Sequence, residues 1–154
     1  MKELRRKDRA IAEDEALEIL KNAEYGVLST VNDAGKPYGV PLNFCVIDNN
    51  IYFHGAVEGQ KIDNFKHNRH VSFCVVRNIE ILPDKFSTAY ESVIIAGEVE
   101  EVFDKNKQIG LEGLIKKISP RFIDQGKYYI EASKDKTRVF RIIISKMTGK
   151  AQKK

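Results

Sequence analysis

The sequence predicts a mainly β protein: a small β-barrel with flanking helices and six or more mostly antiparallel strands. Several runs rich in β-branched and aromatic residues are bounded by turn residues, as is typical of strands. The first three runs are joined by turns too short for the crossover that a parallel pair needs. Helical segments are inserted between later runs, and closing the sheet into a barrel would hide its edges.

The first helix is expected at residues 14–23, DEALEILKNA, because apolar residues recur there at helical spacing. Acidic residues begin this segment and Lys21 lies near its end, which suits the helix dipole. Gly26 breaks the pattern, and the turn signals NDAGKP and DNN separate the runs that follow. Strands are therefore expected at residues 25–31, 38–47 and 51–56.

Further helices and strands are expected in the rest of the chain. Residues 58–68 predict a short helix with Ile62 and Phe65 facing inward. Residues 104–118 predict a longer helix that Asp104 can cap. One or two more helical turns are expected at residues 126–133, and strands at 70–76, 90–102 and 137–145.

Residues 77–89, which contain Pro83, are expected to form a longer connection. Gly97 predicts a bulge or bend inside the strand that follows. No repeat or linker divides the chain. A single domain is expected over residues 1–154, with a basic N-terminal arm at 1–12 and a basic C-terminal tail at 146–154.

Composition limits the classes of function. With 42% hydrophobic and 31% charged residues, the chain is typical of a globular protein. Much of the net charge of +4 lies in the two ends, which we expect to be solvated. No helix-turn-helix or zinc-finger pattern is present, so no nucleic-acid partner is expected, and a small anionic ligand is a simpler use of the charge.

The sequence favours a cytoplasmic protein without a membrane partner. No apolar run approaches the roughly 18 residues that a membrane span requires. The N-terminus lacks the apolar core of a signal peptide. Cys45 and Cys74 lie in apolar strand-like runs and are expected to be buried and unpaired.

Common catalytic and metal-binding patterns are missing. No serine lies in a GxSxG motif, and neither GxGxxG nor GxxxxGK[ST] occurs. His67 and His70 are three residues apart, but no third ligand accompanies them, so we expect surface histidines and no metal.

The stretch YFHGAVEGQKIDNFKHNRHVSF, residues 52–73, is the strongest local candidate for a site. A helix starting near Lys61 presents free backbone N–H groups and the positive end of its dipole. Gly55 and Gly59 would let a ligand approach the backbone closely. The segment is therefore either an ordinary turn, with His54 a hydrogen-bonded strand residue, or a seat for a phosphate.

Taken together, several blocks of the chain resemble a known family. The blocks LST-V, G-PYGVP-NF, IYFHGA and G-KIDN resemble, in order and spacing, the FMN-binding split barrel of pyridoxamine 5′-phosphate oxidases and their relatives. They are most similar to the branch that includes nitroimidazole-resistance reductases. YESVIIAGEVEEV and RIIISKMTGKA resemble later strands of that branch, so the resemblance covers about residues 5–151.

The resemblance implies an FMN that lies across the barrel strands at the interface of a homodimer. It implies that Lys61 grips the phosphate and that the second subunit completes the site, with Tyr90 and Ser92 as candidates. Catalytic residues are not identified, and His54 and Tyr90 are candidates only. The implied cofactor-binding residues are Leu28, Ser29, Thr30, Pro41, Leu42, Asn43, Phe44, Phe53, His54, Gly55, Ala56, Gln60, Lys61 and Ser92.

The chain also departs from the true oxidases. They carry an arginine-lysine pair where this sequence has Gln60-Lys61, and a basic residue where it has Tyr38-Gly39. The oxidase residues that bind the substrate phosphate are not recognisable. We therefore expect an FMN-dependent oxidoreductase acting on another small molecule, with electrons from a nicotinamide or a similar donor.

Several alternatives stay open at the level of sequence. The protein could bind flavin without turning it over, as a sensing module. The barrel could hold haem or a deazaflavin, although His54 is the only strand histidine beside the candidate site. His54 could face either the phosphate or the substrate. Tyr38 and Tyr90 could be aromatic walls of the site or simple packing residues.

Overall fold

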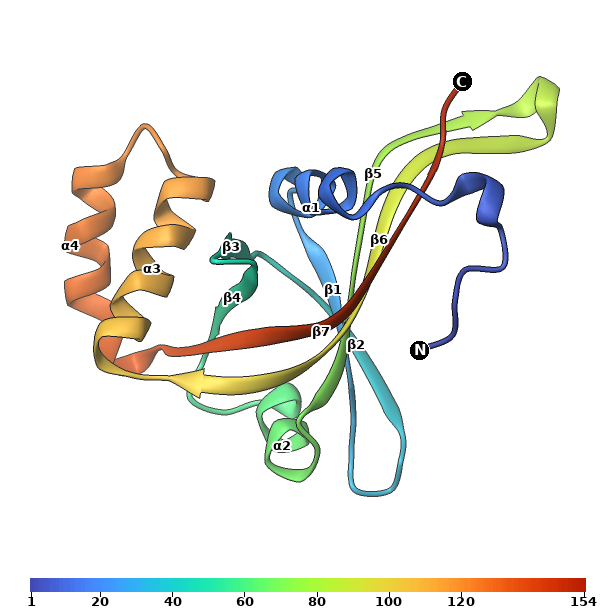
Figure 1. The fold of residues 1–154 in the computed structure, drawn as a ribbon. Coiled ribbons are helices and arrows are strands. Elements are labelled where there is room, and N and C mark those ends of the chain that lie inside the picture. Colours follow the sequence, from blue (N-terminus) through green and yellow to red (C-terminus); the bar gives the residue numbers. More distant parts are fainter.

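The computed structural model describes residues 1–154 and shows one seven-stranded antiparallel sheet with helices around it (Figure 1). The strands are β1 (Gly26–Val31), β2 (Pro37–Leu42), β3 (Cys45–Ile47), β4 (Asn50–Gly55), β5 (His70–Leu82), β6 (Ser87–Val102) and β7 (Arg138–Gln152). The helices are α1 (Glu13–Asn22), α2 (Gln60–His67), α3 (Asp104–Ile118) and α4 (Ile123–Ser133). Short 3₁₀ helices lie at Lys7–Arg9, Pro83–Lys85 and Lys134–Lys136. None of the helices combines the length and apolar character needed to cross a bilayer.

The sheet is curled around a single main core. Its strands follow the order β2-β1-β5-β6-β7-β4-β3. Leu28 and Phe73, near one edge, and Phe53 and Phe140, near the other, belong to the same buried cluster. Phe44 joins this cluster, with its ring centroid 5.0 Å from that of Phe73. Since residues from both ends of the sheet meet in one core, the predicted mainly β architecture of barrel type is confirmed.

The strand expected at residues 38–47 is in fact two strands. β2 pairs with β1 at one edge, and β3 pairs with β4 at the opposite edge. The break falls at Asn43 and Phe44, where the fully buried Phe44 side chain turns into the core. Alternating apolar residues cannot reveal such a break, because both strands continue the same period of two.

The prediction of a long connection at residues 77–89 is wrong. β5 and β6 continue as a projecting hairpin whose turn contains Pro83 (Figure 1). The pairing register shifts between Arg77 and Glu80, and this irregularity lets the ladder continue beyond the apolar part of the strand. Pro83 lies in the turn, where its missing N–H removes no ladder hydrogen bond.

The last strand is longer than expected. β7 extends to Gln152, so most of the segment expected as a solvated tail from residue 146 pairs with β6. The partners of this part of β7 run from Tyr90 to Ala96. The irregularity predicted at Gly97 is present as a register shift between Ala96 and Gly97, but the extra residue is Ser145 of β7. The N-terminal arm touches the same strand through a bridge between Ala10 and Lys150.

The predicted helices are confirmed, with one correction. α3 has the expected bounds, and Ile62 and Phe65 of α2 are buried as predicted. Asp104 does not cap α3. The residue at the cap position is Phe103, and no side chain makes a cap hydrogen bond there. Asp104 therefore contributes only its charge to the first helical turn.

Helices α3 and α4 cover the outer side of the sheet near β3, β4 and β7. A second apolar cluster lies between them and the strands, formed by Cys45, Tyr52, Val102, Leu111, Leu114, Ile130 and Val139. Cys45 is buried as expected, whereas Cys74 is only half-buried, and both thiols are free. Burial raises the pKa of the Cys45 thiol to about 11, so this thiol is unreactive at neutral pH.

Candidate functional site

The junction between β4 and α2 is the segment that the sequence singled out. β4 ends at Gly55, and α2 begins at Gln60. Gly59 precedes the helix with a φ of +147°, a conformation that favours glycine. No side chain caps the helix, so its first backbone N–H groups have no partner within the helix. The helix start can therefore donate hydrogen bonds to an anion.

Lys61 lies over Gly55 at this junction. A Cβ atom at Gly55 would stand 3.1 Å from Cε and 3.4 Å from Nζ of Lys61, so a larger side chain would displace the lysine. Lys61 makes no ion pair and no side-chain hydrogen bond within the chain. The structure thus holds an unpaired, half-buried cation beside the open end of a helix. Both groups favour a bound phosphate or carboxylate.

His54 borders the same junction at the end of β4. Its side chain is exposed, but surrounding atoms still remove part of its solvation. This desolvation, and then the positive charge of Lys61, hold the pKa of His54 below its usual value. The neutral imidazole is therefore favoured in the free protein, and the positive charge of the junction comes from Lys61.

A buried polar network connects α2 to β1. Asn64 and Thr30 are almost fully buried, and Asn64 Nδ2 donates to Thr30 Oγ1 over 2.8 Å. Gln60 Nε2 donates to Asn64 Oδ1 over 2.8 Å, and Thr30 Oγ1 donates to the Tyr38 carbonyl over 3.4 Å. These bonds fix the start of α2, and with it Lys61, against the sheet.

Arg138 fixes the loop on the other side of the junction. It pairs with Gly55 in the sheet, and its Nη1 donates to the carbonyl of Val57 over 3.1 Å. Its Nε and Nη2 donate to the two carboxylate oxygens of Glu101 over 3.1 and 2.6 Å. This forked arrangement sets the orientation of the guanidinium. Glu101 therefore fixes Arg138, and Arg138 in turn fixes the loop before Gly59.

Sequence reasoning missed Asn64 and Arg138. A polar residue between the inward-facing Ile62 and Phe65 was the available signal for Asn64. Arg138 carries no local signal, because its partners Val57 and Glu101 are distant in the sequence.

The other implied cofactor residues fall into two groups. Leu28, Phe44 and Phe53 are fully buried core side chains, so only their backbone could face a ligand. The second group is exposed or half-buried. Pro41, Leu42 and Asn43 lie at the end of β2 and at the β2–β3 break, Ser29 lies on the adjacent β1, and Ala56 lies beside the junction. The structure thus brings Thr30, His54, Gly55, Gln60 and Lys61 around the β4–α2 junction.

Tyr90 and Ser92 are not part of this group within one chain. Both lie on β6, in the part that pairs with the end of β7. In Figure 1 this end of β6 lies toward the projecting β5–β6 hairpin, at the opposite end of the sheet from α2. If these residues serve a ligand at the junction, they must do so from a second copy of the chain.

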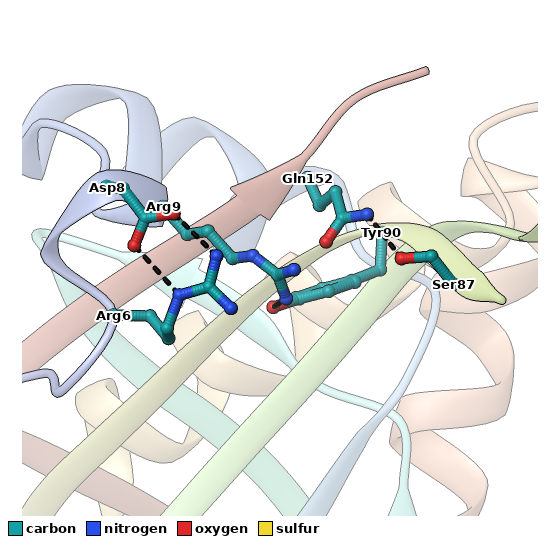
Figure 2. Close-up of polar contacts among 6 residues, drawn as sticks. All are labelled: Arg6, Asp8, Arg9, Ser87, Tyr90 and Gln152. Carbon is teal, nitrogen blue, oxygen red and sulfur yellow. Dashed lines mark hydrogen bonds and ion pairs between the residues drawn. The ribbon is translucent and has the colours of Figure 1, made fainter. Parts of the chain in front are cut away.

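Tyr90 lies between two cations, Lys150 and Arg9, of which Figure 2 shows Arg9. Arg9 Nη1 donates to the Tyr90 hydroxyl over 3.4 Å, and Lys150 Nζ lies 5.9 Å from the ring centroid. Partial burial raises the pKa of Tyr90, but the hydrogen bond from Arg9 and the nearby positive charges of Lys150 and Arg9 outweigh this effect. The net pKa is below its usual value. Close by, Gln152 Nε2 donates to Ser87 Oγ over 2.5 Å, and Arg6 pairs with Asp8 (Figure 2).

The β4–α2 junction is an open surface in the single chain. A polar cavity of about 410 Å³ lies against α2 and is lined by Asn32, Asp33, Gln60, Asp63, Asn64, Lys66 and His67, but it includes neither Lys61 nor Gly55. A larger cavity, about 740 Å³, lies elsewhere, between β3, α3 and α4. Because charge and backbone geometry favour anion binding at the junction, we take the junction, rather than the larger cavity, as the candidate phosphate site.

Solved structures share this fold at low sequence identity. A conserved hypothetical protein of Mycobacterium tuberculosis is 19% identical with a TM-score of 0.82, over 97% of this chain and 90% of that one. A proposed 5-nitroimidazole antibiotic resistance protein of Bacteroides thetaiotaomicron is 22% identical with a TM-score of 0.73, over 92% and 85% of the two chains. An FAD-binding protein of Mesorhizobium loti is 24% identical with a TM-score of 0.72, over 94% and 97%.

Sequence comparison identifies the family. No curated protein sequence matches the chain significantly. The family model described as pyridoxamine 5′-phosphate oxidase matches residues 12–151, which is nearly the whole chain. The matched region contains all seven strands except the end of β7, together with the β4–α2 junction. The chain therefore belongs to the pyridoxamine 5′-phosphate oxidase family.

Proposed function

We propose that this protein binds FMN at the β4–α2 junction and, as a homodimer, uses it in a redox reaction on a small molecule. The observation that carries this proposal is the unpaired Lys61 ammonium held over Gly55 at the open end of α2. A phosphate at this point would receive a full positive charge and the backbone N–H groups of the first helical turn.

The residues at the junction fit the terminal phosphate of a flavin mononucleotide. Gly55 leaves room for the lysine to lie flat, and Asn64 and Arg138 hold the two sides of the junction in place. Family membership and the FAD-binding protein that shares the fold both support a flavin as the ligand. The bound flavin would supply the electron transfer, while the chain would bind and orient it.

The ring of the flavin would extend from the junction along the exposed part of β2 and the β2–β3 break. Pro41 and Asn43 are exposed there, and Ser29 lies on the neighbouring strand. Most side chains in this region are small or neutral, so backbone groups would make most of the polar contacts with the ring. Backbone N–H groups aimed at the pyrimidine edge would stabilise the negative charge of the reduced form.

An apolar face on the outside of the sheet supports the homodimer. Val27, Val76 and Ile94 point away from the core and are 37%, 41% and 40% exposed. Val27 and Ile94 lie in one cross-strand row through Cys74. A second copy packed on this face would cover apolar surface, which favours association. It would also place Tyr90 and Ser92 of β6 near the partner.

The shared fold of the 5-nitroimidazole antibiotic resistance protein suggests one class of substrate. We propose reduction of a small aromatic compound by the bound flavin, with a nicotinamide as electron donor. The alternative is a flavin-binding module without turnover. His54 is the only side chain at the junction that titrates near neutrality, which leaves proton transfer with few candidates. Oxidation of a nicotinamide in the presence of a nitroaromatic acceptor would distinguish the enzyme from the module.

A titration of flavin-free protein with FMN tests the proposal. Replacing Lys61 by Ala removes the phosphate contact, and we expect the dissociation constant for FMN to rise about 10–100-fold, as for loss of one charge-assisted hydrogen bond. Lys61 makes no side-chain hydrogen bond or ion pair within the chain, so thermal stability should change little.

Lys66→Ala is the matched control, because Lys66 is an exposed lysine of the same helix. It should bind FMN as the wild type does. Equal FMN affinity in Lys61→Ala and Lys66→Ala would contradict the phosphate assignment.

A further inference from the structure

A cavity between two helices and a strand lies away from the proposed flavin site. It has a volume of about 740 Å³ and opens between β3, α3 and α4. Figure 1 shows the α3–α4 pair standing beside β3 and β4. Its apolar lining consists of Cys45, Val46, Ile47, Ile109, Ile115, Ile123 and Ile130. The volume is in the range of small-molecule sites, and branched side chains form most of the wall.

Four lysines surround this apolar wall, and only one carboxylate does. The lysines are Lys21, Lys116, Lys117 and Lys127, and the carboxylate is Glu112. Lys21 has Glu18 of its own helix 3.6 Å away. Lys116 and Lys127 are exposed and make no ion pair within the chain. The edge of the cavity therefore carries more positive than negative charge, and Lys116 and Lys127 have no ion-pair partner within the chain.

Lys117 places one of these charges deeper in the fold. It is half-buried, its Nζ donates to the carbonyl of Ala23 over 2.7 Å, and the same atom lies 3.6 Å from the ring centroid of Phe44. Burial lowers the pKa of Lys117, and no nearby carboxylate acts to raise it again. A fixed ammonium of this kind gains from an anion in the adjacent space.

An apolar wall and a cationic edge together favour a ligand that has both an apolar part and a negative charge. A neutral apolar compound would leave the lysines without a partner, and a highly charged compound would leave the isoleucines in contact with polar groups. A single carboxylate on an apolar body satisfies both parts of the cavity.

We propose that the cavity between β3, α3 and α4 binds an amphipathic carboxylate of the medium-chain fatty acid class. The apolar chain would lie among Ile47, Ile109 and Ile115, and the carboxylate would face Lys116 and Lys127. This site does not depend on the flavin proposal, because it contains none of the residues around Lys61.

Calorimetric titration with decanoate, below the concentration at which it forms micelles, tests this inference. We expect saturable binding of one decanoate per chain, and much weaker binding of decan-1-ol, which has the same chain without the charge. Added salt should weaken decanoate binding, because the lysines at the edge are exposed to screening.

Charge variants test the role of the lysine edge. Lys116→Gln combined with Lys127→Gln should weaken decanoate binding about tenfold or more, the effect of removing charge-assisted contacts. Both side chains are exposed, so the fold should persist. The matched control is Lys105→Gln with Lys136→Gln, two exposed lysines outside the cavity, which should bind decanoate as the wild type does.

Ile109→Trp tests the location, because an indole from the half-buried Ile109 position would fill the cavity. Decanoate binding should then be lost while FMN binding persists. The inference is overturned if decanoate does not bind, if decan-1-ol binds equally well, if the Lys116/Lys127 variant binds as its control does, or if a folded Ile109→Trp protein still binds decanoate. FMN titrations of the same proteins would report separately on the flavin site.

Discussion

At the scale of single residues, the candidate site depends on one cation and on the groups that hold it in place. Lys61 has no partner of its own, whereas Asn64 and Arg138 are fully engaged in hydrogen bonds. The residue available to a ligand and the residues that position it are therefore different. Substitutions of Lys61 should affect binding, and substitutions of Asn64 should affect the fold first.

Asn64→Ala should lower the free energy of unfolding by about 1–3 kcal/mol, because it leaves the buried Thr30 hydroxyl without its donor. Chemical denaturation measures this loss. The double variant Thr30→Val with Asn64→Leu removes both partners and should recover part of the stability. Additive effects of Thr30→Val and Asn64→Ala would contradict the coupling of these two side chains.

His54 should make FMN binding depend on pH. The pKa of His54 is lowered in the folded, ligand-free protein, so the imidazole binds a proton more readily in the unfolded chain. The stability that neutral His54 contributes is present above the usual histidine pKa and is lost as the pH falls through the lowered value. A bound phosphate acts in the opposite direction and favours the imidazolium.

The affinity for FMN of the wild type relative to His54→Gln should therefore rise as the pH falls from about 7.5 to about 5.5. The comparison with His54→Gln cancels the titration of the phosphate itself. NMR titration of the His54 ring should show a pKa that rises when FMN is added. A pH-independent ratio of affinities would place His54 away from the phosphate.

At the scale of elements, sequence patterns located most helices and strands but not their partners. α3 was predicted with its observed bounds, because its helical period is long and uninterrupted. The break between β2 and β3 was missed, because it depends on the burial of Phe44 beside Phe73, a contact between distant segments. The extension of β5 and β6 was missed because a polar stretch with Pro83 reads as a loop unless the pairing is known.

The end of β7 is an element whose role is testable by truncation. Gly149 lies against Ile11 and Ala16, so this strand carries the packing of the N-terminal segment and α1. A chain ending at Lys146 would lose the pairs from Met147 to Gln152 with β6. We expect a loss of about 3 kcal/mol or more, comparable to a large core deletion, seen as a lower melting temperature.

Truncation after Gln152 is the matched control, because Lys153 and Lys154 lie beyond the strand. This protein should melt close to the full chain. Similar melting temperatures for the full chain and for the chain ending at Lys146 would show that the segment is the solvated tail that its composition suggests.

At the scale of the whole molecule, the curled sheet leaves two features on its surface. One is the open β4–α2 junction with Lys61, and the other is the apolar outer face with Val27, Val76 and Ile94. The sequence predicted the first from a glycine-flanked turn before a short helix. It could not give the second, because which side of a strand faces outward depends on how the sheet curls. A homodimer built on this face, as we propose, would place Tyr90 and Ser92 near the partner.

The visible absorption spectrum of the purified protein, followed by release and identification of any chromophore, tests flavin binding most directly. We predict a flavin spectrum, release of FMN rather than FAD or haem, and uptake of added FMN by protein from which the flavin has been removed. A colourless protein that also fails to take up added FMN would contradict the proposal and reduce the β4–α2 junction to an ordinary turn.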